Sequence, residues 1–307
     1  MADSDYSTDW AIMQLGGVDK ETGEVLGVPR SLGGSPVREG DPQRRGDEGL
    51  SKAHICTRNG SVTYWLGGSL MRCKKIEFVG GKERRRKGGG KRGKITGWSR
   101  ASRRRMYYTI GRIRRSALPI MITLTYPAEF PARSGEWKDN LRRFWQRLKR
   151  RFPRAGMVWK LEPQKRGAPH YHLLVWGVPW GLYEFRKWVS QAWYEVVGSG
   201  DVRHLIAGTR VEQVRSRRGV MCYAGKYIGK VTDGDCGWDE PGRYWGVKGA
   251  ECIPWADVYN VTLEYRQAVR LLRLMRRYMR CRRGGLLTLT MLCNSPEYWA
   301  TRLREMI

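Results

Sequence analysis

Hydrophobic and polar positions alternate along several short segments between residues 118 and 214. The run LPIMITLTYP (118–127) is rich in β-branched residues and is ended by Pro127. MVWKLEPQ and PHYHLLVWG follow as two more such runs, separated by KRGA, and a fourth lies within 202–214, clearest at TRVEQV. Because successive side chains on a strand point to opposite faces, these runs predict four β-strands.

Between these runs, apolar residues recur at helical spacing. Ser134 can cap a helix that runs to Phe152, and further helices are expected over 182–197 and 217–230. The apolar positions of the first helix are Trp137, Leu141, Phe144, Trp145, Leu148 and Phe152. The order β-α-β-β-α-β-α predicts an α+β fold, with one antiparallel sheet and helices on its faces, in the ferredoxin-like or split βαβ manner.

The flanking regions differ in composition from this central part. Residues 1–50 are rich in Gly, Pro, Ser and Asp and are expected to be disordered. Residues 51–117 are expected to hold a small β element and a basic arm, and residues 118–232 a compact domain. Residues 233–307 are expected to be a basic helical C-terminal extension, with its main helix over 256–283.

Charge changes the picture most. The 307 residues include 58 Lys plus Arg and 29 Asp plus Glu, which gives a net charge of +29 at pH 7. Residues 1–50 contain five basic and ten acidic residues, so the rest of the chain carries +34. An excess of this size indicates a polyanionic partner, with nucleic acid expected ahead of an anionic membrane surface.

The basic arm is the densest part of this charge. Residues 82–115 contain fifteen basic residues and one acidic residue, Glu83. Trp98, Tyr107 and Tyr108 are interleaved and could stack on unpaired bases, although a solvated linker would have the same composition. The residues expected to follow a phosphate backbone are Arg84, Arg85, Arg86, Lys91, Arg92, Arg103, Arg104 and Arg105.

Several classes of protein are excluded by the sequence. No run of 18 apolar residues is present, so no transmembrane helix is expected, and the acidic N-terminus is unlike a secretory signal. The seven cysteines include no CxxC pair, which fits a reducing cytoplasm and argues against a disulfide framework or a zinc finger.

Two of the four histidines, His170 and His172, lie two residues apart in one predicted strand. Both rings should therefore share one face of the sheet, as half of a divalent-metal site or as two ordinary half-exposed side chains. Glu162 on the neighbouring strand is the candidate third ligand. It shares their face only if it pairs with His170 or His172, which requires a connection of three or five residues instead of the four of KRGA. Such ligands suit Mg²⁺ or Mn²⁺.

The segment YAGKYIGK places Tyr223 and Tyr227 on one face of the helix predicted over 217–230, with Lys226 and Lys230 at the same spacing beside them. Nearby cations and a metal-polarised phosphate would help a phenol to attack a phosphodiester. Two half-buried tyrosines flanked by solvated lysines are the structural alternative. Metal ligands followed by such a helix form a layout suited to phosphoryl transfer to tyrosine.

Three motifs together resemble the HUH endonucleases, specifically the rolling-circle replication initiators. ITLTY (122–126) resembles the first motif, and PHYH (169–172), preceded by the stretch from Glu162 to Gly167, resembles the second. YAGKYIGK (223–230) resembles the third, in the two-tyrosine form of the gene A proteins of isometric single-stranded-DNA phages. The resemblance covers roughly residues 118–230.

This resemblance implies an HUH endonuclease fold and a role for each matching residue. His170, His172 and Glu162 would hold the metal, Tyr227 would be the principal nucleophile and Tyr223 the second. Lys226 and Lys230 would lie beside the scissile phosphate, and Thr123 and Thr125 would lie beneath the metal site or touch DNA. The reaction would nick single-stranded origin DNA through a 5′-phosphotyrosine and later rejoin the displaced strand.

The resemblance also implies partners. The chain has no P-loop motif, because GGKRGKIT has Ile95 where Ser or Thr is required, so a host helicase and a replication polymerase are expected in the cytoplasm of a bacterial host of a plasmid or phage. Two alternatives stay open: a two-tyrosine transposase, and a non-enzymatic basic nucleic-acid-binding protein with a ferredoxin-like sheet. His54 and His204 are expected to be structural or at the surface.

Overall fold

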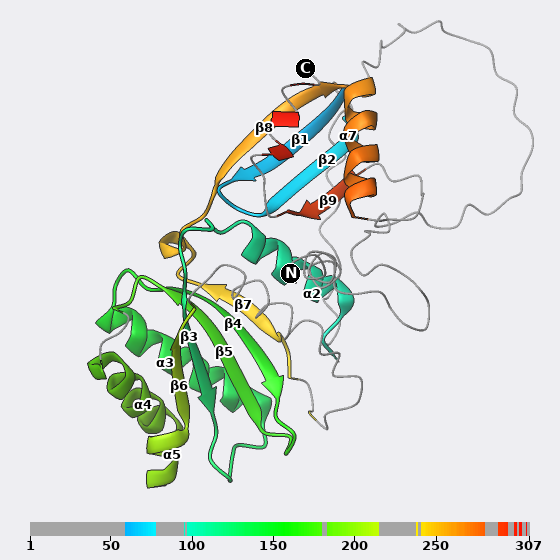
Figure 1. Cartoon of the computed structure of the whole chain (residues 1–307). Helices are drawn as coiled ribbons and strands as arrows, with labels where there is room; N and C mark the ends of the chain where they lie inside the picture. Colours follow the sequence, from blue (N-terminus) through cyan, green and yellow to red (C-terminus); the bar gives the residue numbers. More distant parts are fainter. Residues whose placement is uncertain are drawn as a thin grey trace, which may run out of the picture. The chain divides into compact units, whose positions relative to one another are not determined.

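A computed structural model describes residues 59–77, 95, 97–179, 183–214, 238, 241–279 and 288–293, with residues 298, 299, 301, 302 and 305 near the C-terminus. The chain divides into two compact units. The first combines residues 1–87 with 257–307, and the second comprises residues 88–256. Each contains its own antiparallel sheet (Figure 1). The predicted α+β class is therefore confirmed.

The second unit is built on a five-stranded sheet with the order β6-β3-β5-β4-β7, in which all neighbours are antiparallel. The strands are β3 (Ile120–Thr125), β4 (Gly156–Pro163), β5 (Pro169–Trp176), β6 (Thr209–Gln213) and β7 (Trp245–Lys248). The four predicted strands correspond to β3 to β6. The central position belongs to β5, the strand that carries both paired histidines.

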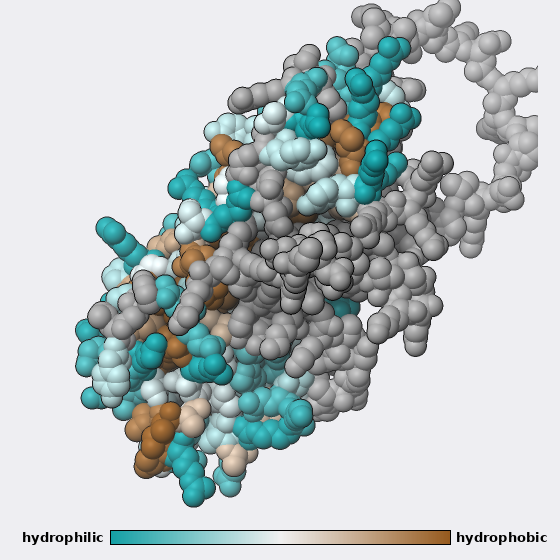
Figure 2. Space-filling model, in the orientation of Figure 1, coloured by the Kyte–Doolittle hydropathy of each residue, from teal (hydrophilic) through white to brown (hydrophobic). Residues whose placement is uncertain are grey.

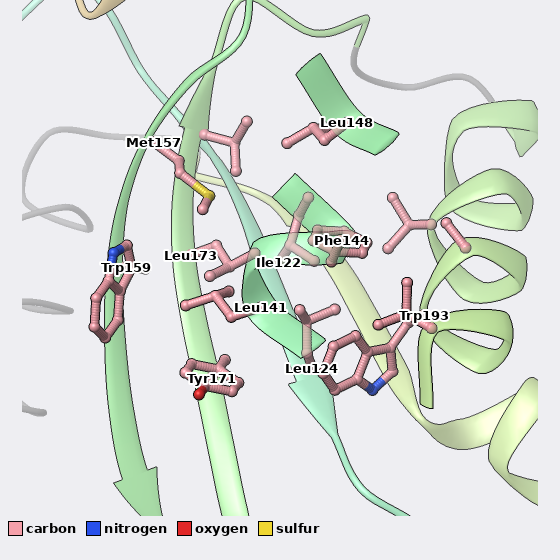
Figure 3. Close-up of a cluster of buried hydrophobic side chains, with 14 of the residues drawn as sticks. Ile122, Leu124, Leu141, Phe144, Leu148, Met157, Trp159, Tyr171, Leu173 and Trp193 are labelled. Carbon is pink, nitrogen blue, oxygen red and sulfur yellow. The ribbon is translucent and has the colours of Figure 1, made fainter. Parts of the chain in front are cut away.

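Two amphipathic helices, α3 (Ser134–Arg151) and α4 (Tyr183–Val197), cover one face of this sheet (Figure 1). Their apolar stripes meet the strand residues that point to that face, so that Phe144, Tyr171 and Trp193 are fully buried together (Figure 3). Both helices were predicted, but the residue that caps α3 is Arg133 and not Ser134. The short helix α5 (Val202–Ala207) follows α4 and precedes β6. The helix predicted over 217–230 lies outside the described residues.

The basic arm is helical over part of its length, because α2 spans Arg100–Gly111 with Ser99 as its N-cap. Trp245 on β7 donates a 3.0 Å hydrogen bond from Nε1 to Ser102 Oγ, which ties the start of α2 to the sheet. Tyr107 is buried, so it is not available to stack on bases as predicted. Helix formation buries one side of the segment because its apolar residues, including Met106 and Ile110, recur at helical spacing.

The first unit contains a four-stranded antiparallel sheet with the order β8-β1-β2-β9, and the helix α7 (Tyr265–Tyr278) packs on one face of it. The strands are β1 (Asn59–Leu66), β2 (Leu70–Glu77), β8 (Asp257–Glu264) and β9 (Thr288–Leu292). The β1–β2 hairpin agrees with the predicted small β element.

The prediction of one helix over 256–283 is wrong in its first part. Residues 257–264 form β8, whose Val261 and Leu263 point to the same face and pair with β1 at Val62 and Gly60. The helix begins only at Tyr265, where Glu264 and Gln267 form a capping box. No helix in the described part of the chain is long and apolar enough to span a membrane.

Candidate active site

Glu162 on β4 pairs directly with His170 on β5. The next pair is Pro163 with Pro169, so five residues, 164–168, connect the two strands. Gly167, with φ of +78°, supplies the left-handed conformation that this turn needs. Residues that pair directly on adjacent strands point to the same face, so Glu162 shares the face of His170 and His172. The register prediction is confirmed, and this face is opposite to the one covered by α3 and α4.

The two histidine rings lie side by side, with centroids 4.5 Å apart and planes at 62°. His172 Nε2 is 3.3 Å from Glu162 Oε2. Burial, followed by the neighbouring His172, lowers the pKa of His170 to about 4. His170 is therefore a neutral imidazole at pH 7, which is the form that binds a metal ion.

Thr123 and Thr125 on β3 support the two rings from the other side. Thr123 pairs with His172 and Thr125 with His170, and in each pair the threonine Oγ1 lies 3.3 Å from the histidine Nδ1. The hydroxyls therefore contact the ring nitrogens nearest the backbone and hold the ring planes. This arrangement matches the position beneath a metal site that the resemblance implied for the threonines.

Lys160 is a charged residue of this face that the sequence analysis did not single out. It pairs with His172 in the ladder, its side chain is only 4% exposed, and its Nζ donates to Glu162 Oε1. Its Nζ also lies 5.4 Å from the centroid of the Trp98 ring. The strand period of two that brought Glu162 to this face also applies to Lys160, so the signal was present in the sequence.

The charge state of Glu162 follows from these contacts. Burial alone would raise the pKa of this carboxyl group. The hydrogen bond with His172 and the adjacent Lys160 charge outweigh burial, so the pKa of Glu162 lies below its ordinary value. Glu162 is therefore an anion at neutral pH.

A second group that the sequence analysis passed over holds the turn between β4 and β5. Arg166 donates to Ala128 O at 3.0 Å and to Tyr126 O at 2.6 Å, and its Nε donates to Gln164 Oε1 at 3.1 Å. Gln164 Nε2 is then directed at His170 Nδ1, 3.1 Å away. Arg166 thus fixes the orientation of the Gln164 amide, and the amide fixes the ring of His170.

The end of β3 is held by its own network. Thr125 O accepts 2.8 Å hydrogen bonds from Trp193 Nε1 and His204 Nε2. Because a carbonyl oxygen can only accept, the proton of His204 is on Nε2, and Nδ1 accepts from Ser199 Oγ at 2.9 Å. His204 is 5% exposed and occupied by these contacts, so it is structural, as predicted.

Other predicted site residues fall differently. Arg103, Arg104 and Arg105 lie on α2, where Arg105 is exposed and the other two are partly buried. The remaining predicted residues lie outside the described part of the chain: Arg84, Arg85, Arg86, Lys91, Arg92, Tyr223, Lys226, Tyr227, Lys230 and His54.

The donor atoms on this face are of the types that bind divalent ions, namely two imidazoles and one carboxylate. In the observed rotamers the Glu162 carboxylate contacts Lys160 and His172. Among the described residues, no group of three or more His, Cys, Asp or Glu side chains is placed to hold a metal ion. Metal binding would therefore exchange the contacts of Glu162 for contacts with the ion.

Comparison with known proteins gives this part of the chain a context. Residues 119–232 match the model of a family of replication-associated proteins, the ORF2 family. This range begins just before β3 and includes the paired histidines and the paired tyrosines. The comparison therefore supports a replication-associated protein.

Two curated proteins of the bacterium Xylella fastidiosa are also similar. "Putative replication protein PDa0002" of strain Temecula1 is 34% identical over 114 residues, which cover 35% of this chain and 41% of that protein. "Putative replication protein XF_b0001" of strain 9a5c is 35% identical over 91 residues, or 28% of this chain and 30% of that protein. The chain thus spans less than half the length of either relative. No solved structure matches significantly.

Proposed function

We propose that this protein is an HUH-type rolling-circle replication initiator that nicks and rejoins single-stranded origin DNA. The observation that carries the proposal is the pairing of Glu162 with His170, which gathers a carboxylate and two imidazoles on one face of the central strands. The same residues lie within the range that matches a replication-associated family. The paired tyrosines follow in the sequence order that such chemistry needs.

In this proposal, His170, His172 and Glu162 hold Mg²⁺ or Mn²⁺. The neutral state of His170 and the anionic state of Glu162 are the states required of ligands. When bound, the ion would supply Lewis-acid polarisation of the scissile phosphate. Thr123, Thr125 and Gln164 would orient the imidazoles through Nδ1.

Tyr227 is the proposed nucleophile. Its phenolic oxygen forms a bond to phosphorus, the bond from phosphorus to the 3′ oxygen breaks, and the leaving oxygen takes a proton to become a free 3′-hydroxyl. Lys226 and Lys230 would offset the negative charge of the phosphate. Tyr223 would attack in the closing step, which restores a DNA phosphodiester. One ester replaces another at each step, so the transfer needs no ATP.

The proposed partners follow from this reaction. The substrate is single-stranded DNA at an origin, and the free 3′-hydroxyl primes a host polymerase. The sequence contains no P-loop, so a host helicase would separate the strands. The printed organism of the similar replication proteins is a bacterium, which supports action in a bacterial cytoplasm.

Two other functions have less support. A two-tyrosine transposase would share the site, but the matching family and both relatives are named for replication. A non-enzymatic protein that binds bases on its sheet would need aromatic residues on the open face of the central strands. Tyr171, between the two histidines, is fully buried on the opposite face.

The test is adduct formation. The protein is incubated with Mn²⁺ or Mg²⁺ and single-stranded DNA from its own origin region, and the mixture is run on a denaturing gel. The proposal predicts a metal-dependent covalent adduct that is lost in His170→Ala/His172→Ala and in Tyr223→Phe/Tyr227→Phe. An adduct that forms equally in EDTA, or persists in the tyrosine double variant, would contradict it.

A further inference from the structure

The helix α7 of the first unit carries a straight row of four arginines: Arg266, Arg270, Arg273 and Arg277. All four are exposed, whereas Ala268, Leu271, Leu272 and Met275 are buried against the sheet. At about 100° per residue, the four arginines fall within an arc of about 60°, opposite the buried residues. At about 1.5 Å per residue, the row is about 16 Å long. The outer side of α7 is largely hydrophilic (Figure 2).

Nothing in the described structure neutralises this row. The helix sequence, YRQAVRLLRLMRRY, contains no acidic residue, and none of the four arginines has an ion pair among the described residues. Neighbouring arginines stand three or four residues apart, so the like charges repel one another. Arg266 also lies in the first turn, where the helix dipole disfavours a cation. The row is therefore not explained by the stability of the helix.

The basic helix α3 of the second unit provides a contrast. Its Arg142 pairs with Asp139 at 3.1 Å, and its Arg147 pairs with Glu195 on α4. These cations have anionic partners within the protein. The arginine row of α7 has the opposite character, which indicates a partner that brings the anions.

We propose that the arginine row of α7 binds the phosphate backbone of duplex DNA, without reading its sequence. Four aligned cations suit a rigid and regular line of phosphates, and arginine donates to phosphate in a planar fork. Proteins that grip unpaired strands interleave basic and aromatic residues, and no aromatic residue lies between these arginines. No side chain of the row is of the amide type that reads adenine edges.

This inference rests on the proposed function, because an enzyme that nicks a single strand at an origin must also hold the duplex beside it. The first unit would hold that duplex while the second unit acts on the unpaired strand. The recognised chemistry is a double-stranded array of phosphates.

The test compares two quadruple variants of the full chain. One is Arg266→Gln, Arg270→Gln, Arg273→Gln and Arg277→Gln on α7. The matched control removes the same charge from exposed positions of α3, with Arg142→Gln, Arg143→Gln, Arg150→Gln and Arg151→Gln. A third variant, with lysine at the four α7 positions, keeps the charge and guards against misfolding of the glutamine variant.

Affinity is measured by fluorescence anisotropy against a blunt DNA hairpin, one unpaired strand of equal length and phosphatidylserine–phosphatidylcholine vesicles, over a range of salt. For the hairpin, the α7 glutamine variant should lose about tenfold or more in affinity at low salt. Its salt slope should fall by about 3 to 4 if every arginine meets a phosphate. The α3 control should change much less, and the lysine variant should stay near the wild type.

Equal losses in the α7 and α3 variants would show an effect of net charge alone and overturn the proposal. So would a loss confined to the unpaired strand, or one confined to vesicles, which would indicate a lipid surface. The adduct assay on single-stranded DNA separates this idea from the proposed function, because the α7 variant should form adduct normally there. Failure of the wild type to form adduct counts against the nickase and leaves the duplex measurement to be judged by itself.

Discussion

The Glu162 carboxylate lies between two cationic or hydrogen-bonding neighbours, and its closest relation is with Lys160, two residues before it on the same strand. The Lys160 side chain is 4% exposed and that of Glu162 is 15% exposed. A buried cation without its anion is costly, whereas replacing both charges with apolar groups can be nearly neutral. This pair therefore has a structural role as well as a proposed catalytic one.

The two roles can be separated by substitution. Glu162→Ala should destabilise the protein by about 3–5 kcal/mol, because Lys160 is left buried and unpaired. The double variant Lys160→Met/Glu162→Met should recover most of this loss in urea unfolding, yet form no adduct. If the double variant recovers both stability and adduct formation, Glu162 has no part in the chemistry.

The turn between β4 and β5 gives a second prediction. Gln164→Ala removes the amide that contacts His170 Nδ1, so Mn²⁺ affinity measured by calorimetry should fall about tenfold. Single-strand binding in EDTA should not change, which marks Gln164 as a positioning residue. Lys165→Ala alters an exposed neighbour in the same turn and is the matched control. Equal effects of the two substitutions would contradict the role assigned to Gln164.

The lowered pKa of His170 predicts how stability depends on pH. Its pKa is about 4 in the folded protein and 6.5 ordinarily, so between these values the unfolded chain binds a proton that the folded protein does not. Stability in EDTA should therefore fall as pH drops from 6.5 to 4, by about 1–3 kcal/mol from this group.

This prediction is checked by proton NMR of the imidazoles, which is simple because the chain has four histidines. The signal that disappears in His170→Gln should titrate near pH 4. Urea midpoints of that variant should also depend less on pH over this window. A His170 signal that titrates near 6.5 would show that the imidazole is not held neutral.

His204 should behave as a structural residue. His204→Ala removes one of the two donors to Thr125 O, which should cost about 1–3 kcal/mol in urea unfolding. His204→Gln can place an amide nitrogen where Nε2 lies, so it should keep most of the stability and the full Mn²⁺ affinity. A loss of metal affinity in a stable Gln variant would instead make His204 a ligand.

Some of this site could be predicted from the sequence because it follows the strand period of two. That period placed His170 and His172 on one face and tied the role of Glu162 to an odd connection, which the five-residue turn provides. The same period applied to Lys160, which went unnoticed because a lysine reads as a surface residue until its strand is known to be buried.

Other features depend on contacts that no local pattern contains. The bonds from Arg166 to Tyr126 O and Ala128 O join segments about 40 residues apart and exist only in the folded turn. The strand β8 was mistaken for helix because its pairing partner, β1, lies near the other end of the chain. Its alternating Val261 and Leu263 become informative only beside Val62 and Gly60.

The central claim is that the chain transfers a DNA phosphate to a tyrosine of YAGKYIGK. Mass spectrometry of the tryptic adduct tests it most directly, because trypsin separates Tyr223, in GVMCYAGK, from Tyr227, in YIGK. After reaction with Mn²⁺ and single-stranded origin DNA, the 5′-phosphonucleotide should be found on the Tyr227 peptide, and on the Tyr223 peptide in Tyr227→Phe. A nucleotide carried by any other peptide, or no covalent nucleotide with either metal, would contradict the claim.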